Sequence, residues 1–171
     1  MIFVVLGKTA AGKTTFSNFV KRKYGYYVFE IGNYVRSEYE KSNQSLSLLE
    51  FANSFNRNGK LSYFVEQAII ESKKIKSDNL MFSGVRTVEE LMCIKRIYPL
   101  LITVKITCSY ENRKERYCKF SKDHVTIDDR NRLESIWAGE DFKNIHIDHE
   151  ICNDNSIKCF HKKISNLFNV L

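Results

Sequence analysis

The chain has 171 residues, of which 43% are hydrophobic and 13% are aromatic, and its formal net charge is +7. This length is typical of one compact domain, so we expect a single domain over residues 1–171 with a packed core rather than a disordered chain. No apolar run approaches the roughly 20 residues that a membrane-spanning helix needs, so no membrane association is expected. The positive charge favours anionic partners, either polyphosphate substrates or nucleic acid.

The cysteines and histidines are scattered. The five cysteines include no C-x-x-C pair, and the four histidines show no metal-ligand spacing. Such a pattern is typical of reduced thiols and predicts neither disulfides nor zinc. The apolar start, residues 1–6, is short and has no basic residues before it, which indicates a buried strand rather than a signal peptide. We therefore expect a cytoplasmic protein.

In chain order, the hydrophobic pattern predicts alternating strands and helices. Strands are expected over residues 2–6, 26–31, 79–82, 100–107 and 147–152. Helices are expected from residue 13, over 34–75 with a break near 56–59, over 87–98 and 109–120, and over 157–171. A capping box, Thr87 with Glu90, marks the start of the helix at residue 87. The alternation predicts an α/β fold with a parallel five-stranded sheet and helices on both faces.

One motif carries specific chemistry. Residues 7–14 read Gly-Lys-Thr-Ala-Ala-Gly-Lys-Thr and fit the pattern G-x-x-x-x-G-K-[ST] at every fixed position. The two glycines let successive amides turn towards phosphate oxygens, and the helix that follows presents its positive end to the same anion. In this pattern Lys13 reaches the β- and γ-phosphates of ATP, and the Thr14 hydroxyl ligates Mg²⁺. The predicted ATP-binding residues are Gly7, Ala10, Ala11, Gly12, Lys13, Thr14 and Thr15.

Further segments resemble, in order, the P-loop nucleotide kinases of the adenylate kinase and dephospho-CoA kinase group. Residues 31–36 (IGNYVR) resemble the acceptor-side segment of adenylate kinase-like enzymes, and residues 82–86 (FSGVR) resemble their Asp-Gly-x-Arg element. Residues 129–134 (DRNRLE) resemble a lid, and residues 147–154 (IDHEICND) resemble the late strand and loop of dephospho-CoA kinase. The resemblance implies a three-layer P-loop NTPase fold with a phosphate acceptor site.

The resemblance also implies a helical acceptor-binding region over about residues 33–76. There, Arg36 and Arg86 would hold the phosphate of the acceptor, because guanidinium groups match phosphate oxygens bidentately. Gly32 and Asn33 would lie beside them. The alternative is that these arginines are merely solvated surface groups.

A short helical lid is implied over about residues 121–140. Its arginines Arg130 and Arg132, with Arg116 on the preceding helix, would close over the γ-phosphate and exclude water. Asn153 would lie near the adenine. A charged segment of this kind is also typical of a solvated face.

Two acids of the family pattern are replaced. Asn33 stands where an acid is common, and Ser83 stands where an aspartate normally ends the strand. Ser83 can hold a Mg²⁺-bound water but supplies no negative charge. A hydroxyl acceptor needs a general base, whereas an ionised phosphate acceptor does not. The sequence therefore favours a nucleoside or deoxynucleoside monophosphate kinase, with Asp78, Asp128 or Asp129 as the acids that could compensate.

Two other functions stay open. A dephospho-CoA kinase-like enzyme would phosphorylate a hydroxyl, and a carboxylate within reach of the γ-phosphate would favour it. A nucleotide-binding regulator without turnover would be favoured by a basic surface away from the P-loop. ATP is expected rather than GTP, because no Asn-Lys-x-Asp pattern is present. No RNA-binding aromatic motif is present, so nucleic acid is not an expected partner, and the sequence indicates no oligomeric state.

Overall fold

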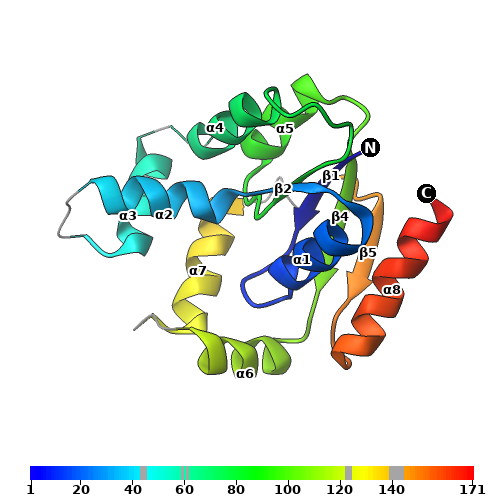
Figure 1. Cartoon of the computed structure of the whole chain (residues 1–171). Coiled ribbons are helices and arrows are strands. Elements are labelled where there is room, and N and C mark those ends of the chain that lie inside the picture. Colours follow the sequence, from blue (N-terminus) through cyan, green and yellow to red (C-terminus); the bar gives the residue numbers. More distant parts are fainter. Residues whose placement is uncertain (43–45, 59, 61, 122–124, 139–144) are drawn as a thin grey trace.

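The computed structural model describes residues 1–42, 46–58, 60, 62–121, 125–138 and 145–171, without the side chains of residues 56, 57, 137 and 138. The described residues form a five-stranded parallel sheet in the order β2-β3-β1-β4-β5 (Figure 1). The strands are β1 (Ile2–Leu6), β2 (Tyr27–Glu30), β3 (Leu80–Ser83), β4 (Ile102–Thr107) and β5 (His149–Cys152). All five predicted strands are confirmed, most of them shorter than the apolar pattern indicated.

Helices connect the strands. They are α1 (Lys13–Tyr24), α2 (Ile31–Lys41), α3 (Leu48–Arg57), α4 (Tyr63–Ser72), α5 (Val88–Ile97), α6 (Tyr110–Phe120), α7 (Ile127–Ala138) and α8 (Ile157–Val170). The predicted helical stretch 34–75 is three helices, α2 to α4. Of the predicted lid, α7 is described, whereas residues 122–124 and 139–140 lie outside the described residues. The capping box that opens α5 is confirmed.

Helices cover both faces of the sheet, because successive strand residues point to opposite sides. On one face, β1 and β3 pack against α4 and α5, and the shared cluster includes Val4, Leu6, Val65, Ile69, Phe82, Leu91 and Ile94. On the other face the sheet packs against α1 and α8, and the cluster includes Phe3, Val5, Phe16, Val20, Met81, Phe160 and Ile164. The predicted three-layer α/β fold is confirmed.

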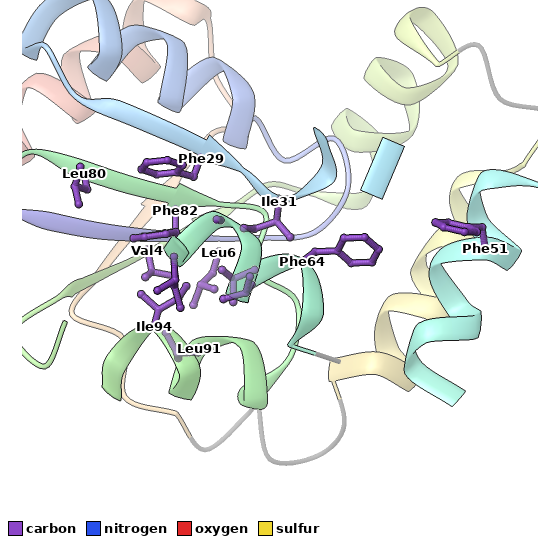
Figure 2. Close-up of a cluster of buried hydrophobic side chains, with 14 residues drawn as sticks. Val4, Leu6, Phe29, Ile31, Phe51, Phe64, Leu80, Phe82, Leu91 and Ile94 are labelled. Carbon is purple, nitrogen blue, oxygen red and sulfur yellow. The ribbon is translucent and has the colours of Figure 1, made fainter. Parts of the chain in front are cut away.

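The first cluster extends beyond the sheet towards the acceptor region. Figure 2 shows Val4 and Phe82 on the sheet above Leu91 and Ile94 of α5, with Phe51 of α3 well away from the strands. Phe51 joins the cluster through aromatic contacts, which include an edge-on contact with Phe55 at a centroid distance of 5.2 Å. Buried aromatic contacts therefore anchor α3 to the body of the molecule.

The topology determines where a ligand can bind. Since all the strands are parallel, their carboxyl ends lie at one edge, and β3 and β4 flank β1 on opposite sides. The chain connections therefore diverge at the carboxyl end of β1, and open α/β sheets bind ligands in the crevice outside such a point. Residues 7–12 lie there. Among the described helices, none combines the length and the apolar character that crossing a bilayer requires.

Candidate active site

The P-loop backbone has a shape that its glycines make possible. Gly7 has φ 144° and Gly12 has φ 109°. A Cβ atom on Gly7 would lie 2.5 Å from the carbonyl oxygen of Ile106, and one on Gly12 would lie 2.3 Å from the Asn153 amide nitrogen. Ala10, at φ 62°, also adopts the left-handed conformation. These conformations turn the backbone between β1 and α1 into a concave loop that suits an anion.

Lys13 lies within this loop. Its Nζ donates hydrogen bonds to the carbonyl oxygens of Gly7, at 2.6 Å, and Lys8, at 3.0 Å. Desolvation lowers the pKa of Lys13 to about 8, Glu134 and Glu30 oppose this shift, and Arg86 and Arg113 add to it. Side chains from four separate segments are thus close enough to Lys13 to affect its charge. They form a mixed cluster of cations and carboxylates beside the P-loop.

Glu30 is the residue that sequence analysis missed. It ends β2, and its register places it beside Ser83 at the end of β3, which in turn lies beside Val5 of β1. The Glu30 Oε1 atom and the Ser83 hydroxyl are both buried and have no hydrogen-bond partner among the described residues. Two adjacent unsatisfied oxygens next to a lysine are well suited to a ligand. The signal that could have identified it is a carboxylate at the end of a strand. It was missed because the predicted strand ran one residue too far, to Ile31.

The residues present fit Mg²⁺ bound mainly by water and phosphate. The Thr14 side chain is exposed at the start of α1, where the sequence motif places the metal ligand. Ser83 and Glu30 offer oxygens on the adjacent strands. Within the described ranges, no three His, Cys, Asp or Glu side chains converge on a metal-sized site. Mg²⁺ in nucleotide sites typically takes few protein ligands and keeps several waters.

A pocket of about 210 Å³ lies between α2, α3, α7 and the loop after β3. It brings together four of the predicted residues, Gly32, Arg36, Arg86 and Arg130, and adds Lys60. The lining also includes the apolar side chains of Ile31, Val35, Leu48, Ala52, Phe55 and Phe64. The pocket therefore combines a cationic part with an apolar part, as a phosphate-bearing organic molecule requires.

Two residues position the arginines of this pocket. Asn33 lines a different pocket, of about 400 Å³, and its Oδ1 accepts a hydrogen bond from Arg36 at 2.6 Å. Glu90 accepts hydrogen bonds from the backbone amides of Arg86 and Thr87, which fixes the turn after β3. Burial raises the pKa of Glu90 to about 7. Asn33 thus orients a predicted acceptor-binding residue rather than lining the arginine pocket.

The predicted lid arginines occupy different environments. Arg130 reaches the pocket, whereas Arg132 is exposed and does not line it. Arg116 donates to the carbonyl oxygen of Asn153, at 2.8 Å, and contacts the Cys108 sulfur. Its guanidinium thus binds the loop after β5.

Arg113, which the sequence analysis did not select, lies against the P-loop instead. It is 4% exposed and donates to the Thr9 carbonyl oxygen, at 3.1 Å, and to Asn131 of α7, at 2.9 Å. Its Nε is buried without a partner among the described residues. Arg113 precedes Arg116 by one helical turn, and only the packing of α6 distinguishes the two.

Asn153, in the loop after β5, contacts the backbone of the P-loop. Its side-chain amide is buried and donates to the Ala11 carbonyl oxygen at 2.8 Å, while its backbone amide donates to Thr107. The side chain is therefore engaged with the loop backbone, and a contact with adenine stays a prediction.

No protein-family model matches this chain. A curated relative, the dephospho-CoA kinase of Mycoplasma genitalium, is 28% identical over 102 residues. The match covers 60% of this chain and 46% of the relative, so the chain spans less than half of that enzyme's length.

Solved structures match over nearly the whole chain. TT1252 from Thermus thermophilus superposes with a TM-score of 0.64 at 16% identity, over 100% of this chain and 97% of that one. Deoxyadenosine kinase from M. mycoides, solved with bound dATP, gives a TM-score of 0.61 at 15% identity, over 99% of this chain and 100% of that one. The chain therefore shares the fold of these structures, carries the P-loop at the carboxyl end of β1, and is similar in sequence to a dephospho-CoA kinase over part of its length.

Proposed function

We propose that this chain is an ATP-dependent kinase that transfers the γ-phosphoryl group to a hydroxyl group of a phosphate-bearing nucleotide. The observation that carries the proposal is Glu30, a carboxylate close enough to Lys13 to affect its pKa, with one buried oxygen that has no hydrogen-bond partner among the described residues. The sequence favoured a monophosphate acceptor because Ser83 stands where a carboxylate base is normally found. A base near the transferring phosphoryl group favours an acceptor that must lose a proton.

In this proposal Glu30 accepts the proton of the acceptor hydroxyl while that oxygen forms its bond to the γ-phosphorus. The bond between the γ-phosphorus and the bridging oxygen breaks, and ADP leaves with the electron pair. Lys13, Arg86 and Arg113 neutralise the charge that develops on the phosphoryl oxygens. Thr14, with Ser83 through water, would hold Mg²⁺, which supplies further neutralisation of the β- and γ-phosphate oxygens.

The acceptor would lie in the arginine pocket. Arg36, Arg86, Arg130 and Lys60 give it four cationic side chains, more than an uncharged nucleoside needs. Glu90, the acid in the lining, is already engaged with two backbone amides. The balance favours an acceptor that carries at least one phosphate group in addition to its hydroxyl. Dephospho-CoA fits this description, and the curated relative bears the name of the enzyme that uses it.

A nucleoside or deoxynucleoside monophosphate kinase is the second candidate. The same arginine pocket favours it, because the monophosphate would be both the bound anion and the nucleophile. In that case Glu30 would help to hold Mg²⁺ through water rather than serve as a base. A regulator that binds ATP without turnover is the third candidate, and a cytoplasmic location stays a prediction for all three.

The test is an assay of ADP release with Mg²⁺-ATP and a panel of acceptors. The panel contains dephospho-CoA, nucleoside 5′-monophosphates, deoxynucleoside 5′-monophosphates and the corresponding nucleosides. We expect stimulation by a phosphate-bearing compound, with the product phosphorylated on a hydroxyl. Stimulation by uncharged nucleosides alone would contradict the role of the arginine pocket. ATP binding without stimulation by any acceptor would favour the regulator.

A further inference from the structure

A carboxylate from α7 contacts the P-loop. Glu134 accepts two hydrogen bonds from Thr9, one from its backbone amide at 3.1 Å and one from its hydroxyl. The Thr9 carbonyl oxygen accepts from Arg113, which also binds Asn131 of α7. Thr9 thus joins α6 and α7 to the loop, and the contact brings a negative charge to a loop whose expected ligand is an anion.

The position of Glu134 relative to Lys13 matters most. Burial is the largest influence on Lys13 and lowers its pKa, and among the charged side chains Glu134 has the largest effect, in the opposite direction. Among the described residues, the Glu134 carboxylate is therefore the strongest counter-charge to Lys13. In a P-loop, this lysine binds the β- and γ-phosphates. The carboxylate and the γ-phosphate consequently compete for the same positive charge.

We propose that Glu134 is a specificity-determining residue that competes with the γ-phosphate for the positive charge of the P-loop, so that it weakens the binding of ATP more than the binding of ADP. The inference rests on the proposed ATP site. Two negative groups near one lysine repel each other, and the repulsion grows with the charge of the nucleotide. ADP lacks the γ-phosphate, so less of its charge lies beside Glu134.

A glutamine at this position separates charge from packing. Its amide oxygen can accept from the Thr9 N–H group, and its amide nitrogen can donate to the Thr9 hydroxyl oxygen. Glu134→Gln therefore keeps both contacts and removes the charge alone. A purely structural role predicts equal or weaker nucleotide binding in this variant, whereas competition predicts tighter binding.

The experiment measures dissociation constants for Mg²⁺-ATP and Mg²⁺-ADP by calorimetry in the natural protein, in Glu134→Gln and in Asp78→Asn. Asp78 is exposed, precedes β3 at the opposite edge of the sheet, and its replacement removes the same single charge. We expect Glu134→Gln to bind ATP about three- to tenfold tighter and ADP at most about twofold tighter, a range consistent with partly exposed charge pairs. Asp78→Asn should change both constants by less than about 1.5-fold.

Several outcomes would overturn the inference. If Glu134→Gln binds ATP no tighter than the natural protein, or gains equally for ATP and ADP, then Glu134 does not compete with the γ-phosphate. A melting temperature measured for each variant identifies a loss of binding that comes from misfolding. If Glu134→Gln is misfolded, Glu134→Asp is measured in its place, because it keeps the charge and shortens the side chain. Glu134→Asp should bind ATP like the natural protein or up to about twofold tighter. Weaker binding would also overturn the inference. Failure of the natural protein to bind ATP would instead contradict the proposed function, and the inference with it.

Discussion

The P-loop and the arginine pocket lie at the same edge of the sheet, but the chain builds them differently. The P-loop is eight consecutive residues whose shape is held by close contacts of Gly7 and Gly12 and by the bond from Asn153 to Ala11. The arginine pocket combines residues that stand far apart in the sequence, from Ile31 to Arg130. In Figure 1, α2 and α3 extend away from the sheet, and α7 lies between them and α6. A local motif determines the first region, and tertiary packing determines the second.

This difference has functional consequences. A change within the P-loop should affect every nucleotide-dependent property at once, because all of them need the same loop. A change in the pocket should affect the acceptor alone. Glu30 is close enough to Lys13 to affect its pKa and directly precedes Ile31 of the arginine pocket, although it lines the pocket that Asn33 lines. As the proposed base, its loss should affect the transfer step without affecting binding.

The largest effect is expected for Lys13→Ala. Removing the amine should lower kcat/KM by about a thousandfold or more and weaken ATP binding, because no other group takes its place in the loop. Steady-state kinetics and calorimetry measure both quantities. Lys8→Ala is the matched control, since Lys8 is an exposed residue of the same loop and contributes only its carbonyl oxygen to Lys13. Retained activity in Lys13→Ala would refute the role of the P-loop.

Glu30→Gln should come next. If Glu30 is the base, kcat should fall by about 10²- to 10⁴-fold while the dissociation constant of ATP stays within about twofold. Glu40→Gln, an exposed carboxylate on α2, should behave like the natural protein. A Glu30→Gln variant with an unchanged kcat would remove the main argument for a hydroxyl acceptor.

Arg36→Ala should sharpen the separation of the two regions. Losing one charge-assisted contact should raise the KM of the acceptor about 10- to 100-fold and leave the KM of ATP unchanged. The control is Arg96→Ala, an exposed arginine near the end of α5. An increase in the KM of ATP instead would mean that Arg36 serves the nucleotide side.

The pH dependence of ATP binding should follow Lys13. Its pKa of about 8 lies below the ordinary 10.5, so the free protein loses this charge as the pH rises through 8. Phosphate oxygens bind the protonated amine, so ATP affinity should be full below pH 7 and fall by up to about tenfold per pH unit above pH 8. Calorimetry between pH 7 and pH 9 tests this. In Lys13→Arg the guanidinium stays charged, and the decline above pH 8 should disappear.

Asn153→Ala should have the smallest effect on the rate of phosphoryl transfer. Its effect on the stability of the fold should be measurable. It leaves the Ala11 carbonyl oxygen without its buried donor, which should cost about 1–3 kcal/mol of unfolding free energy. The melting temperature should then fall by roughly 3–10 °C. Asn155→Ala, an exposed asparagine two residues later, should leave the melting temperature unchanged.

The two regions also differ in how well the sequence predicted them. The strands and the P-loop were predictable, because apolar periodicity and an eight-residue motif are local signals. Glu30 was missed, because its role depends on the register of β2 with β3 and on the exact end of the strand. Arg113 and Arg116 could not be separated, since both lie on one face of α6 and only its packing decides which reaches Thr9. The environment of Asn153 was equally out of reach, because it depends on the contact between two loops that are 142 residues apart.

The central claim is that the γ-phosphoryl group is transferred to a hydroxyl, with Glu30 as the base. The most direct measurement is phosphorus NMR of the product formed from Mg²⁺-ATP and the best acceptor of the panel, with the natural protein and with Glu30→Gln. The account predicts a new phosphomonoester signal that forms at least about a hundredfold more slowly with the variant. A new diphosphate signal, formed equally fast by both proteins, would contradict it and identify a monophosphate kinase.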